Sequence, residues 1–244
     1  MTTAARLNCL NTSLNAAAAD IAALQSENTA LQAHVDALEA SRIPGLTEYL
    51  SVDVATDSVI FSGANVYVES GSGATDGALN GRGNLVIGYG EDGVYYGRGP
   101  SDRTGSHNLV VGGGHSYTSM GGLVAGFHNM ASAEFASVCG GEDNESSGAA
   151  STVSGGFRNV ASGDWSSVSG GSLQIASGEF SAVSGGRSNV ASGPNSSVSG
   201  GGFSEASGAY SSVLGGADNE AIGDYSAILG GDGVSVRMNY DTSP

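Results

Sequence analysis

The side chains best suited to binding a ligand are concentrated between positions 89 and 117 of the chain. Aromatic rings, guanidinium groups and imidazoles in this segment can stack on flat molecules and form charge-assisted hydrogen bonds. We predict that the ligand-contact residues are Tyr95, Tyr96, Arg98, Arg103, His107, His115 and Tyr117. The alternative, which is the simpler interpretation, is a structural loop that closes the end of a repeat domain or joins neighbouring subunits.

A column of aromatic residues recurs farther along the chain, at intervals of fifteen residues or a multiple of fifteen. An acidic residue directly precedes four of its five members. The members are Phe135, Trp165, Phe180, Tyr210 and Tyr225. On strands stacked about 4.8 Å apart, these rings would form a vertical stripe. We expect the stripe to pack between subunits, and the alternative is an exposed surface that binds a sugar or a protein.

No group of residues indicates an active site. The segment 88–93 matches the pattern G-x-G-x-x-G, but no helical pattern follows it, and glycine-rich chains match by chance. The segment 230–233 resembles one fragment of a calcium-binding nonapeptide, without the recurring aspartate of such repeats. The histidines have no metal-binding spacing, and Cys9 and Cys139 are too few for a disulfide framework. We therefore predict that the protein is not an enzyme and holds no metal ion and no cofactor.

A repeat of fifteen residues must carry these side chains. Pairs of glycines recur with this step from 140/141 to 230/231, together with a valine column, an asparagine column and an alanine column. The valine column consists of Val138, Val153, Val168, Val183, Val198, Val213 and Ile228. A fixed period over this length indicates a solenoid, and fifteen residues suit one coil with two short strands and two tight turns.

The repeat also predicts which side chains are internal. Valine and alanine are expected to point inward from the two strands, and serine is expected to alternate outward. The asparagine column, from Asn129 to Asn219, should form a ladder in which each side chain bonds its counterpart in the next coil. One coil then buries little more than one Val and one Ala, which hardly offsets the entropy of ordering this chain. We therefore expect self-association to supply the missing burial.

The units with the pattern Ser-Val-x-Gly-Gly-x-x-Asn-x-Ala-Ser-Gly resemble the head repeats of trimeric autotransporter adhesins of the YadA type. The resemblance covers about residues 84–233. It implies a mainly β fold, a left-handed parallel β-roll that assembles as a homotrimer, and adhesion at a bacterial surface. The partner would be a glycan or a protein on the surface of a host, a prey cell or a neighbouring cell.

Two features depart from that family. The repeat has fifteen residues where the family commonly has fourteen, and the second inward position runs Ile87, Val111, Ala125, Gly140. This order predicts a roll that is wider near its start and slimmer afterwards. The first two rungs, at 84–88 and 108–112, are 24 residues apart, so the residues between them should form a loop on one face.

Residues 7–42 predict a parallel coiled coil. Apolar residues follow a spacing of three and four for about five heptads, from Leu7 to Leu38. Asn28 occupies an a position, where a buried amide fixes the register, and a ligand or ion site on the axis is the alternative. The core residues permit two or three strands, and the resemblance favours three. The segment 43–45, Ile-Pro-Gly, is expected to end the helix.

These patterns divide the 244 residues into four parts. They are a coiled-coil stalk (1–43), a β-rich connector (44–83) with strands around Val52, Val59 and Val66, a β-roll head (84–233) and a tail (234–244). A formal charge of −16 argues against nucleic acid or an anionic membrane as a partner. No apolar segment is long enough to span a membrane, and no segment resembles a signal peptide.

The sequence thus predicts a non-enzymatic, homotrimeric fibre protein that is extracellular or at the cell surface and recognises another surface through its β-roll head. The alternative is a structural or receptor-binding fibre of a phage or tail-like particle, which would suit synthesis without a signal peptide. Ice binding by a flat face is not favoured, because such faces need rows of threonine and only Thr152 lies inside the regular repeats.

Overall fold

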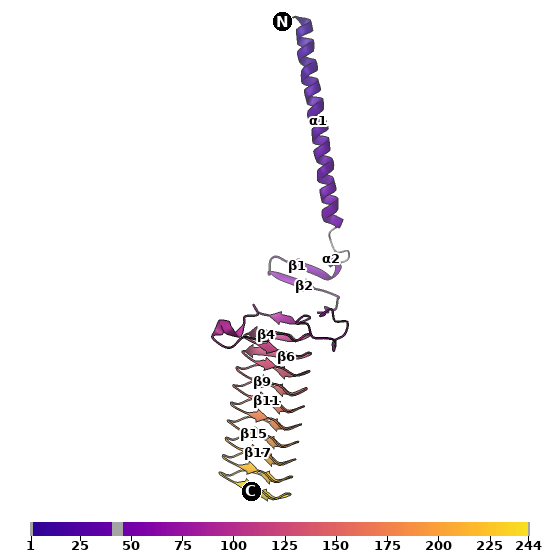
Figure 1. Cartoon of the computed structure of the whole chain (residues 1–244). Helices are drawn as coiled ribbons and strands as arrows, with labels where there is room; N and C mark the ends of the chain where they lie inside the picture. The colour runs from indigo at the N-terminus through magenta and orange to yellow at the C-terminus, as the bar shows by residue number, and fades with distance from the viewer. Residues whose placement is uncertain (1, 41–45, 244) are drawn as a thin grey trace. The chain divides into compact units, whose positions relative to one another are not determined.

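The computed structural model describes residues 2–40 and 46–243, and the chain divides into one unit that ends at Val66 and another that begins at Tyr67. The first unit starts with helix α1 (Thr3–Ala40; Figure 1). The large apolar residues of its heptads between Leu7 and Val35 are exposed, from 44% for Val35 to 70% for Leu10. A single helix with such a stripe fits one strand of a coiled coil. Asn28 lies in this helix and is exposed, and the predicted helix end at 43–45 lies outside the described residues.

Helix α2 (Leu46–Tyr49) leads into an antiparallel hairpin of β1 (Leu50–Asp53) and β2 (Ser58–Phe61). Val52 pairs with Val59, which confirms the first two strands expected in the connector. The third expected strand, around Val66, is wrong, because residues 62–84 form no regular strand. This segment is rich in Gly and also contains Asn, and both residue types are depleted in strands. Its part from Tyr67 onward belongs to the second unit.

The second unit is a parallel β-solenoid whose coils are stacked one on the next (Figure 1). Its strands form two parallel sheets, with eleven strands in one and nine in the other among the described residues. The first sheet contains β3 (Leu85–Ile87), β4 (Leu109–Gly113), β6 (Leu123–Phe127), β8 (Ser137–Val138), β10 (Thr152–Val153), β12 (Ser167–Val168), β14 (Ala182–Val183), β16 (Ser197–Val198), β18 (Ser212–Val213), β20 (Ala227–Ile228) and β22 (Thr242–Ser243). The second contains β5 (Ser116–Tyr117), β7 (Met130–Ala131), β9 (Glu145–Ser146), β11 (Val160–Ala161), β13 (Ile175–Ala176), β15 (Val190–Ala191), β17 (Glu205–Ala206), β19 (Glu220–Ala221) and β21 (Ser235–Val236). The prediction of a mainly β solenoid with coils of about fifteen residues is confirmed.

Each coil encloses two columns of small apolar side chains, as predicted. The valine column is 0 or 1% exposed from Val138 to Ile228, and the alanine column is 0% exposed from Ala161 to Ala221. The expectation that the serines face outward is wrong for one column. This column, 0 or 1% exposed, contains Ser151, Ser166, Ser181, Ser196, Ser211 and Ser226. These serines point inward because each lies two residues before a buried valine and shares its side of the strand.

The asparagine column forms a ladder, but its bonds differ from those expected. Asn144 N donates to Asn129 Oδ1 (2.8 Å), and Asn159 N donates to Asn144 Oδ1 (2.9 Å). The side-chain amide of Asn144 donates to the carbonyls of Gly140 (3.1 Å) and Gly156 (3.0 Å). Each side chain therefore bonds the backbone of its own coil and of the next, because the glycine corner brings these groups within reach. The ladder satisfies backbone groups that would otherwise be buried without partners.

The first regular coils are one residue shorter than the later coils. Val124 pairs with Val138, fourteen residues away, whereas Phe127 bridges to Glu142, fifteen residues away. One residue is therefore inserted between Val138 and Glu142. The step of fifteen arises from a single added residue at this corner.

The predicted column from Ile87 to Gly140 can be followed through the first coils. Ile87 pairs with Val111, and Val111 pairs with Ala125. The side-chain amides of Asn129 and Asn144 donate to the carbonyls of Ala125 and Gly140, each four residues before its asparagine. The column adjoins the buried valines on the outer side of the strand, where Ile87 is 55% exposed. The predicted narrowing of the roll is therefore wrong, because these side chains do not fill its interior.

Candidate functional site

The predicted contact residues lie in or beside the loop between β3 and β4. A 3₁₀-helix, η1 (Gly93–Tyr96), forms within this loop. Asp92 caps the helix, since its Oδ1 atom accepts a hydrogen bond from Val94 N (3.0 Å), and this bond lowers the pKa of Asp92. Gly97 closes the helix with a left-handed φ of 71°. The loop thus has a defined local structure of its own.

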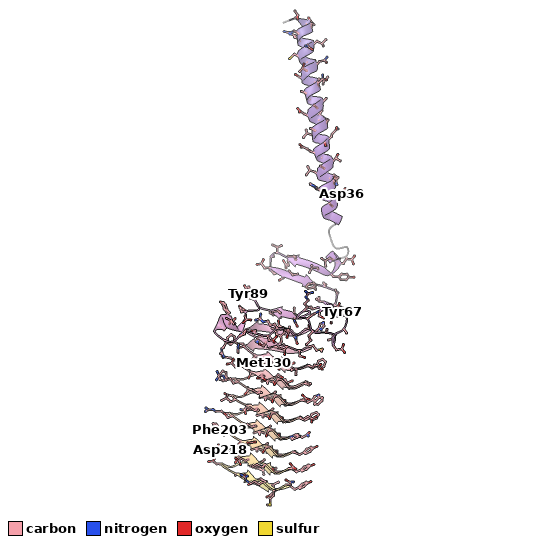
Figure 2. All side chains as sticks on the ribbon, viewed as in Figure 1. Asp36, Tyr67, Tyr89, Met130, Phe203 and Asp218 are labelled. Atoms are coloured by element: carbon pink, nitrogen blue, oxygen red, sulfur yellow. The ribbon has the colours of Figure 1, made fainter. Side chains whose placement is uncertain are left out.

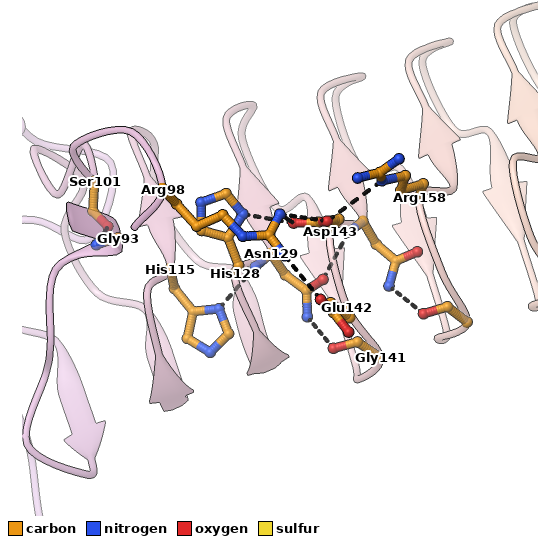
Figure 3. Close-up of polar contacts among 12 residues, drawn as sticks. Gly93, Arg98, Ser101, His115, His128, Asn129, Gly141, Glu142, Asp143 and Arg158 are labelled. Carbon is orange, nitrogen blue, oxygen red and sulfur yellow. Dashed lines mark hydrogen bonds and ion pairs between the residues drawn. The ribbon is translucent and has the colours of Figure 1, made fainter. Parts of the chain in front are cut away.

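Arg98 attaches the loop to the side of the solenoid (Figure 3). Its Nη1 atom donates to both carboxylate oxygens of Asp143, at 2.8 and 2.7 Å, and its Nη2 atom donates to Glu142 (2.9 Å). His128 Nδ1 lies 2.7 Å from Asp143 Oδ1, and Arg158 Nε lies 3.5 Å from Asp143 Oδ2. Asp143 is therefore the centre of an ionic cluster formed by these five side chains.

The cluster keeps Asp143 ionised. Burial raises the pKa of this carboxyl group, but hydrogen bonds from Arg98 and His128 outweigh burial and leave the pKa below its ordinary value. Beside the cluster is a cavity of about 280 Å³, whose lining includes Met130 and Glu145. The cluster therefore offers a fixed carboxylate, already paired with basic side chains, at the edge of a shallow cavity.

One column of the repeat supplies three members of the cluster, a relationship that we did not predict. His128, Asp143 and Arg158 are fifteen residues apart, and their φ angles are positive, between 52° and 55°. The column continues to Phe203 and Asp218, which lie one above the other at the edge of the solenoid (Figure 2). The equal spacing was visible in the sequence, but the varied residue types concealed it.

Tyr95 and Tyr96 form an aromatic group with Phe127 of β6. Tyr96 packs edge to face against Tyr95 (5.0 Å, 90°) and against Phe127 (4.8 Å, 83°). Burial, and then the nearby carboxylate of Glu91, raise the pKa of Tyr96. Tyr95 is 76% exposed and Tyr96 is 37% exposed, so Tyr95 is the more accessible of the two predicted contacts.

Three of the predicted contact residues stabilise the second unit from within. They are Arg103, His115 and Tyr117. Arg103 donates to the backbone carbonyls of Glu91 and His115, and it thereby fixes the base of the loop. His115 and Tyr117 are only 2% and 7% exposed, so their side chains are placed inside the protein rather than on a contact surface. His115 Nδ1 accepts a hydrogen bond from Asn129 N (3.1 Å), which makes His115 the first rung of the asparagine ladder.

His107 joins the irregular segment after Tyr67 to the first coils. Its Nε2 atom accepts a hydrogen bond from Ser70 N (3.1 Å), and its Nδ1 atom lies 3.1 Å from the carbonyl oxygen of Thr75. His107 also lines a cavity of about 320 Å³ together with residues of this segment. Both ring nitrogens are thus engaged in holding the segment.

The residues of the aromatic column lie at the same turn of their coils, and their rings are about half exposed. Exposure is 47–55% and φ is 53–59° for Phe135, Trp165, Phe180, Tyr210 and Tyr225. Positive φ is unfavourable for bulky side chains, and the turn imposes it at this position in each coil. Tyr240 extends the column and was missed, although it lies fifteen residues after Tyr225.

The rings form two stacks, which together we call the aromatic ladder. Trp165 stacks on Phe180 with centroids 4.9 Å apart and an interplanar angle of 8°. Tyr225 stacks on Tyr210 (4.9 Å, 4°) and on Tyr240 (4.8 Å, 4°). In the single chain the ladder is an ordered surface of parallel rings.

Among the described residues, no three His, Cys, Asp or Glu side chains are grouped in a way that would hold a metal ion. None of the described helices combines the length and the apolar character that crossing a membrane requires. The chain matches no protein-family model, and no curated protein is significantly similar to it. The candidate sites therefore rest on the geometry of this chain.

Proposed function

We propose that this protein is a non-enzymatic, homotrimeric fibre of the bacterial surface that recognises another surface through its solenoid. The observation that carries the proposal is the apolar stripe of α1, in which Leu7, Leu14, Leu24 and Leu31 are 62–65% exposed. Burying this stripe requires further helices, and parallel copies of the same chain would place identical stripes in register. Assembly through α1 would bring identical solenoids together.

A column of glycines supports close packing of these copies. Gly186 has a φ of +95°, and a Cβ added to Gly193 would lie 2.1 Å from the carbonyl oxygen of Gly208, so both positions need glycine within one chain. Neither of these reasons requires glycine at position 185. The φ of Gly185 is not positive, and nothing in the described chain lies within 4 Å of an added Cβ. The same is true of Gly170, Gly200, Gly215 and Gly230.

Each of these residues is the first glycine of a Gly-Gly pair, and we call them the leading glycines. Glycine loses more conformational freedom on folding than alanine does, so a repeated glycine without a role in the single chain indicates a requirement from outside it. The backbone of another copy, approaching closely, would supply that requirement.

Recognition would be multivalent. With the leading glycines packed between copies, the aromatic ladders would stay exposed, which is the alternative to packing between subunits. Three copies would present three sets of the loop that carries Tyr95 and three aromatic ladders, and weak contacts repeated on one particle combine into higher avidity. The charge of −16 on each chain would keep the particle soluble and away from anionic partners. The resemblance of the repeats to YadA-type heads supports the same assembly, with left-handed coils and a location outside the cell.

Light scattering on the full chain tests the assembly. We expect three times the chain mass of 24.0 kDa. Changing Leu14 and Leu24 to Asp should give the mass of a single chain, because charges would enter the coiled-coil core. Changing Ala19 and Ser26 to Asp, on the outer face of the helix, is the matched control and should preserve the assembly. A single-chain mass for the unaltered protein would contradict the homotrimer.

Flow cytometry with the fluorescently labelled full chain tests recognition on bacterial and animal cells. We expect binding by the assembled protein and a loss on the order of a hundredfold for the variant with Asp at Leu14 and Leu24, because the contacts are no longer multivalent. Locating the native protein in cell fractions distinguishes a cell-surface fibre from a fibre of a phage or tail-like particle. A protein found only in released tail-like particles would contradict the cell-surface assignment.

A further inference from the structure

The aromatic ladder is interrupted at Asn195, which stands at the same turn as Phe180 and Tyr210 in the coil between them. Within the described chain, Phe180 stacks on Trp165 and Tyr210 stacks on Tyr225, and neither stacks on a further ring. The face of Phe180 and the face of Tyr210 that are directed toward Asn195 are therefore not covered by any other ring.

This gap has room for one ring. Neighbouring rings in the two stacks are 4.9 Å apart, which is the rise of one coil. Phe180 and Tyr210 are two coils apart, so their rings are separated by about 10 Å. A six-membered ring midway between them would lie about 5 Å from each, within the range of stacked rings. The repeating backbone fixes the points from which the two walls extend, so a guest ring would need no rearrangement of the coils.

Asn195 gives the gap a polar floor. Its backbone N–H donates to Glu179 O (2.8 Å), which fixes the residue at the turn. Asn195 is exposed, and its side chain is shorter than a phenyl ring, so it does not fill the space that a ring would take at this position. The amide presents two donor hydrogens and one acceptor oxygen.

The walls and the floor together match the two-sided chemistry of a pyranose ring. The C–H faces of a pyranose are apolar and can pack against aromatic rings, whereas its edge carries hydroxyl groups that can bond an amide. A planar aromatic guest would satisfy the walls, but it would place a C–H edge against the Asn195 amide. The polar floor therefore favours a sugar over an aromatic side chain.

The charges near the gap favour a neutral sugar. The residues that precede the ladder positions here are Glu179, Pro194 and Ala209, which place one carboxylate and no basic group beside the gap. The whole chain has a formal charge of −16. A carboxylated or phosphorylated sugar would be repelled by both.

We propose that the gap at Asn195 binds one neutral hexopyranose residue of a surface glycan, held between Phe180 and Tyr210 with its hydroxyl groups on the Asn195 amide. This inference rests on the proposed function and names the class of ligand that the aromatic ladder takes. Each chain offers this site once, so assembly of three chains places three equivalent sites on one particle. Weak binding of a single sugar then becomes effective on a dense glycan surface.

A second interruption of the ladder, at Ala150, provides a comparison within the same chain. Ala150 lies fifteen residues after Phe135 and fifteen residues before Trp165, so this gap has aromatic walls but a methyl group as its floor. Because a methyl group offers no hydrogen bond to a hydroxyl, sugars should bind this gap more weakly. Ala150→Asn should reproduce the arrangement at Asn195 and add a second site to each chain.

Saturation-transfer NMR on the full chain tests the proposal, with the methyl glycosides of glucose, galactose and mannose as probes. We expect transfer to the ring protons of at least one of these sugars. Asn195→Ala and Phe180→Ser should each weaken binding between about threefold and tenfold, the effect of losing hydrogen bonds or one stacked ring. Tyr225→Ser removes a ladder ring that does not border the gap and should leave the affinity within about twofold.

Several outcomes would overturn the sugar site. They are the absence of transfer to all three sugars, transfer that Asn195→Ala and Phe180→Ser leave unchanged, and binding of p-cresol in place of the sugars, which would identify an aromatic guest. A failed sugar titration together with intact cell binding rejects the gap at Asn195 alone. Absence of cell binding by the unaltered assembled protein rejects the proposed function itself.

Discussion

His115 accepts a hydrogen bond at Nδ1 from the backbone N–H of Asn129 (3.1 Å), and Asn129 Oδ1 accepts the equivalent bond from Asn144 N (2.8 Å). His115 Nε2 lies 3.0 Å from Val111 O, just as Asn129 Nδ2 lies 2.6 Å from Ala125 O. An imidazole with one donor and one acceptor nitrogen thus replaces the amide at the first rung of the ladder. The replacement introduces a titratable group at a position that is otherwise insensitive to pH.

His115 should make the stability of the protein depend on pH. Burial lowers the pKa of His115 below its ordinary value of 6.5. The unfolded chain therefore takes up a proton at a higher pH than the folded chain does. The free energy of unfolding should fall as the pH drops from about 6.5 toward the lowered pKa of the folded state, and this contribution should be constant at higher pH. Thermal unfolding measured from about pH 8 to about pH 5 checks this expectation.

His115→Asn is the matched control for that experiment, because asparagine keeps one donor and one acceptor without titrating. His107 and His128 are present in both proteins, so the difference between the two pH profiles isolates His115. Identical profiles would show that His115 does not carry the pH dependence.

Gln174 keeps only part of the bonding of the asparagine that it replaces. Its Oε1 atom accepts a hydrogen bond from Asn189 N (3.0 Å), but its Nε2 atom is buried without a partner in the described chain. Asn189 Nδ2, by contrast, donates to Gly185 O (3.0 Å) and Gly201 O (3.1 Å). Gln174→Asn should restore such bonds and raise the free energy of unfolding by about 1–2 kcal/mol. Denaturant titration measures the change, and a less stable variant would contradict the account of the ladder.

The two glycines of one corner should respond differently to alanine. Gly186→Ala should destabilise the coil by about 2 kcal/mol or more, because φ is +95° and the added Cβ would lie 2.1 Å from Gly201 O. Gly185→Ala should leave the stability of the single chain unchanged or raise it by about 0.5–1 kcal/mol, while it weakens assembly. Thermal unfolding and sedimentation equilibrium separate the two effects. Unimpaired assembly of Gly185→Ala would remove the support that the leading glycines lend to close packing.

Arg98→Met should detach the loop and leave the coils folded. The change removes the hydrogen bonds to Asp143 and Glu142, whereas His128 continues to face Asp143. We expect limited proteolysis within residues 89–107 to become faster, on the order of tenfold, with little change in the unfolding temperature of the solenoid. Arg158→Met is the control, because that side chain is 56% exposed and makes a single 3.5 Å contact in the cluster. Equal cleavage rates for Arg98→Met and the unaltered protein would contradict the role of Arg98.

The periodicity of the chain by itself determined the solenoid and the helix. Each coil follows the same backbone path, so a period of fifteen residues places Val168 beside Val153. Heptad spacing likewise predicts α1, because a helix places residues three and four apart on one side. Both inferences need only local geometry, which a single sequence contains.

The tertiary structure decided which partners the irregular residues take. Arg98 and Asp143 are 45 residues apart and meet because the loop folds back along the side of the coils, a path that no period specifies. In the sequence, His115 has the character of a residue that contacts a ligand at the surface. In the folded coil, its imidazole is instead aligned with Asn129 and bonded to it. The spacing of the aromatic ladder was evident in the sequence. The stacking of its rings and the gap at Asn195 follow from the positive φ at this turn and from the rise of one coil. Contacts between segments with no common period depend on the folded path in space, so only the structure reveals them.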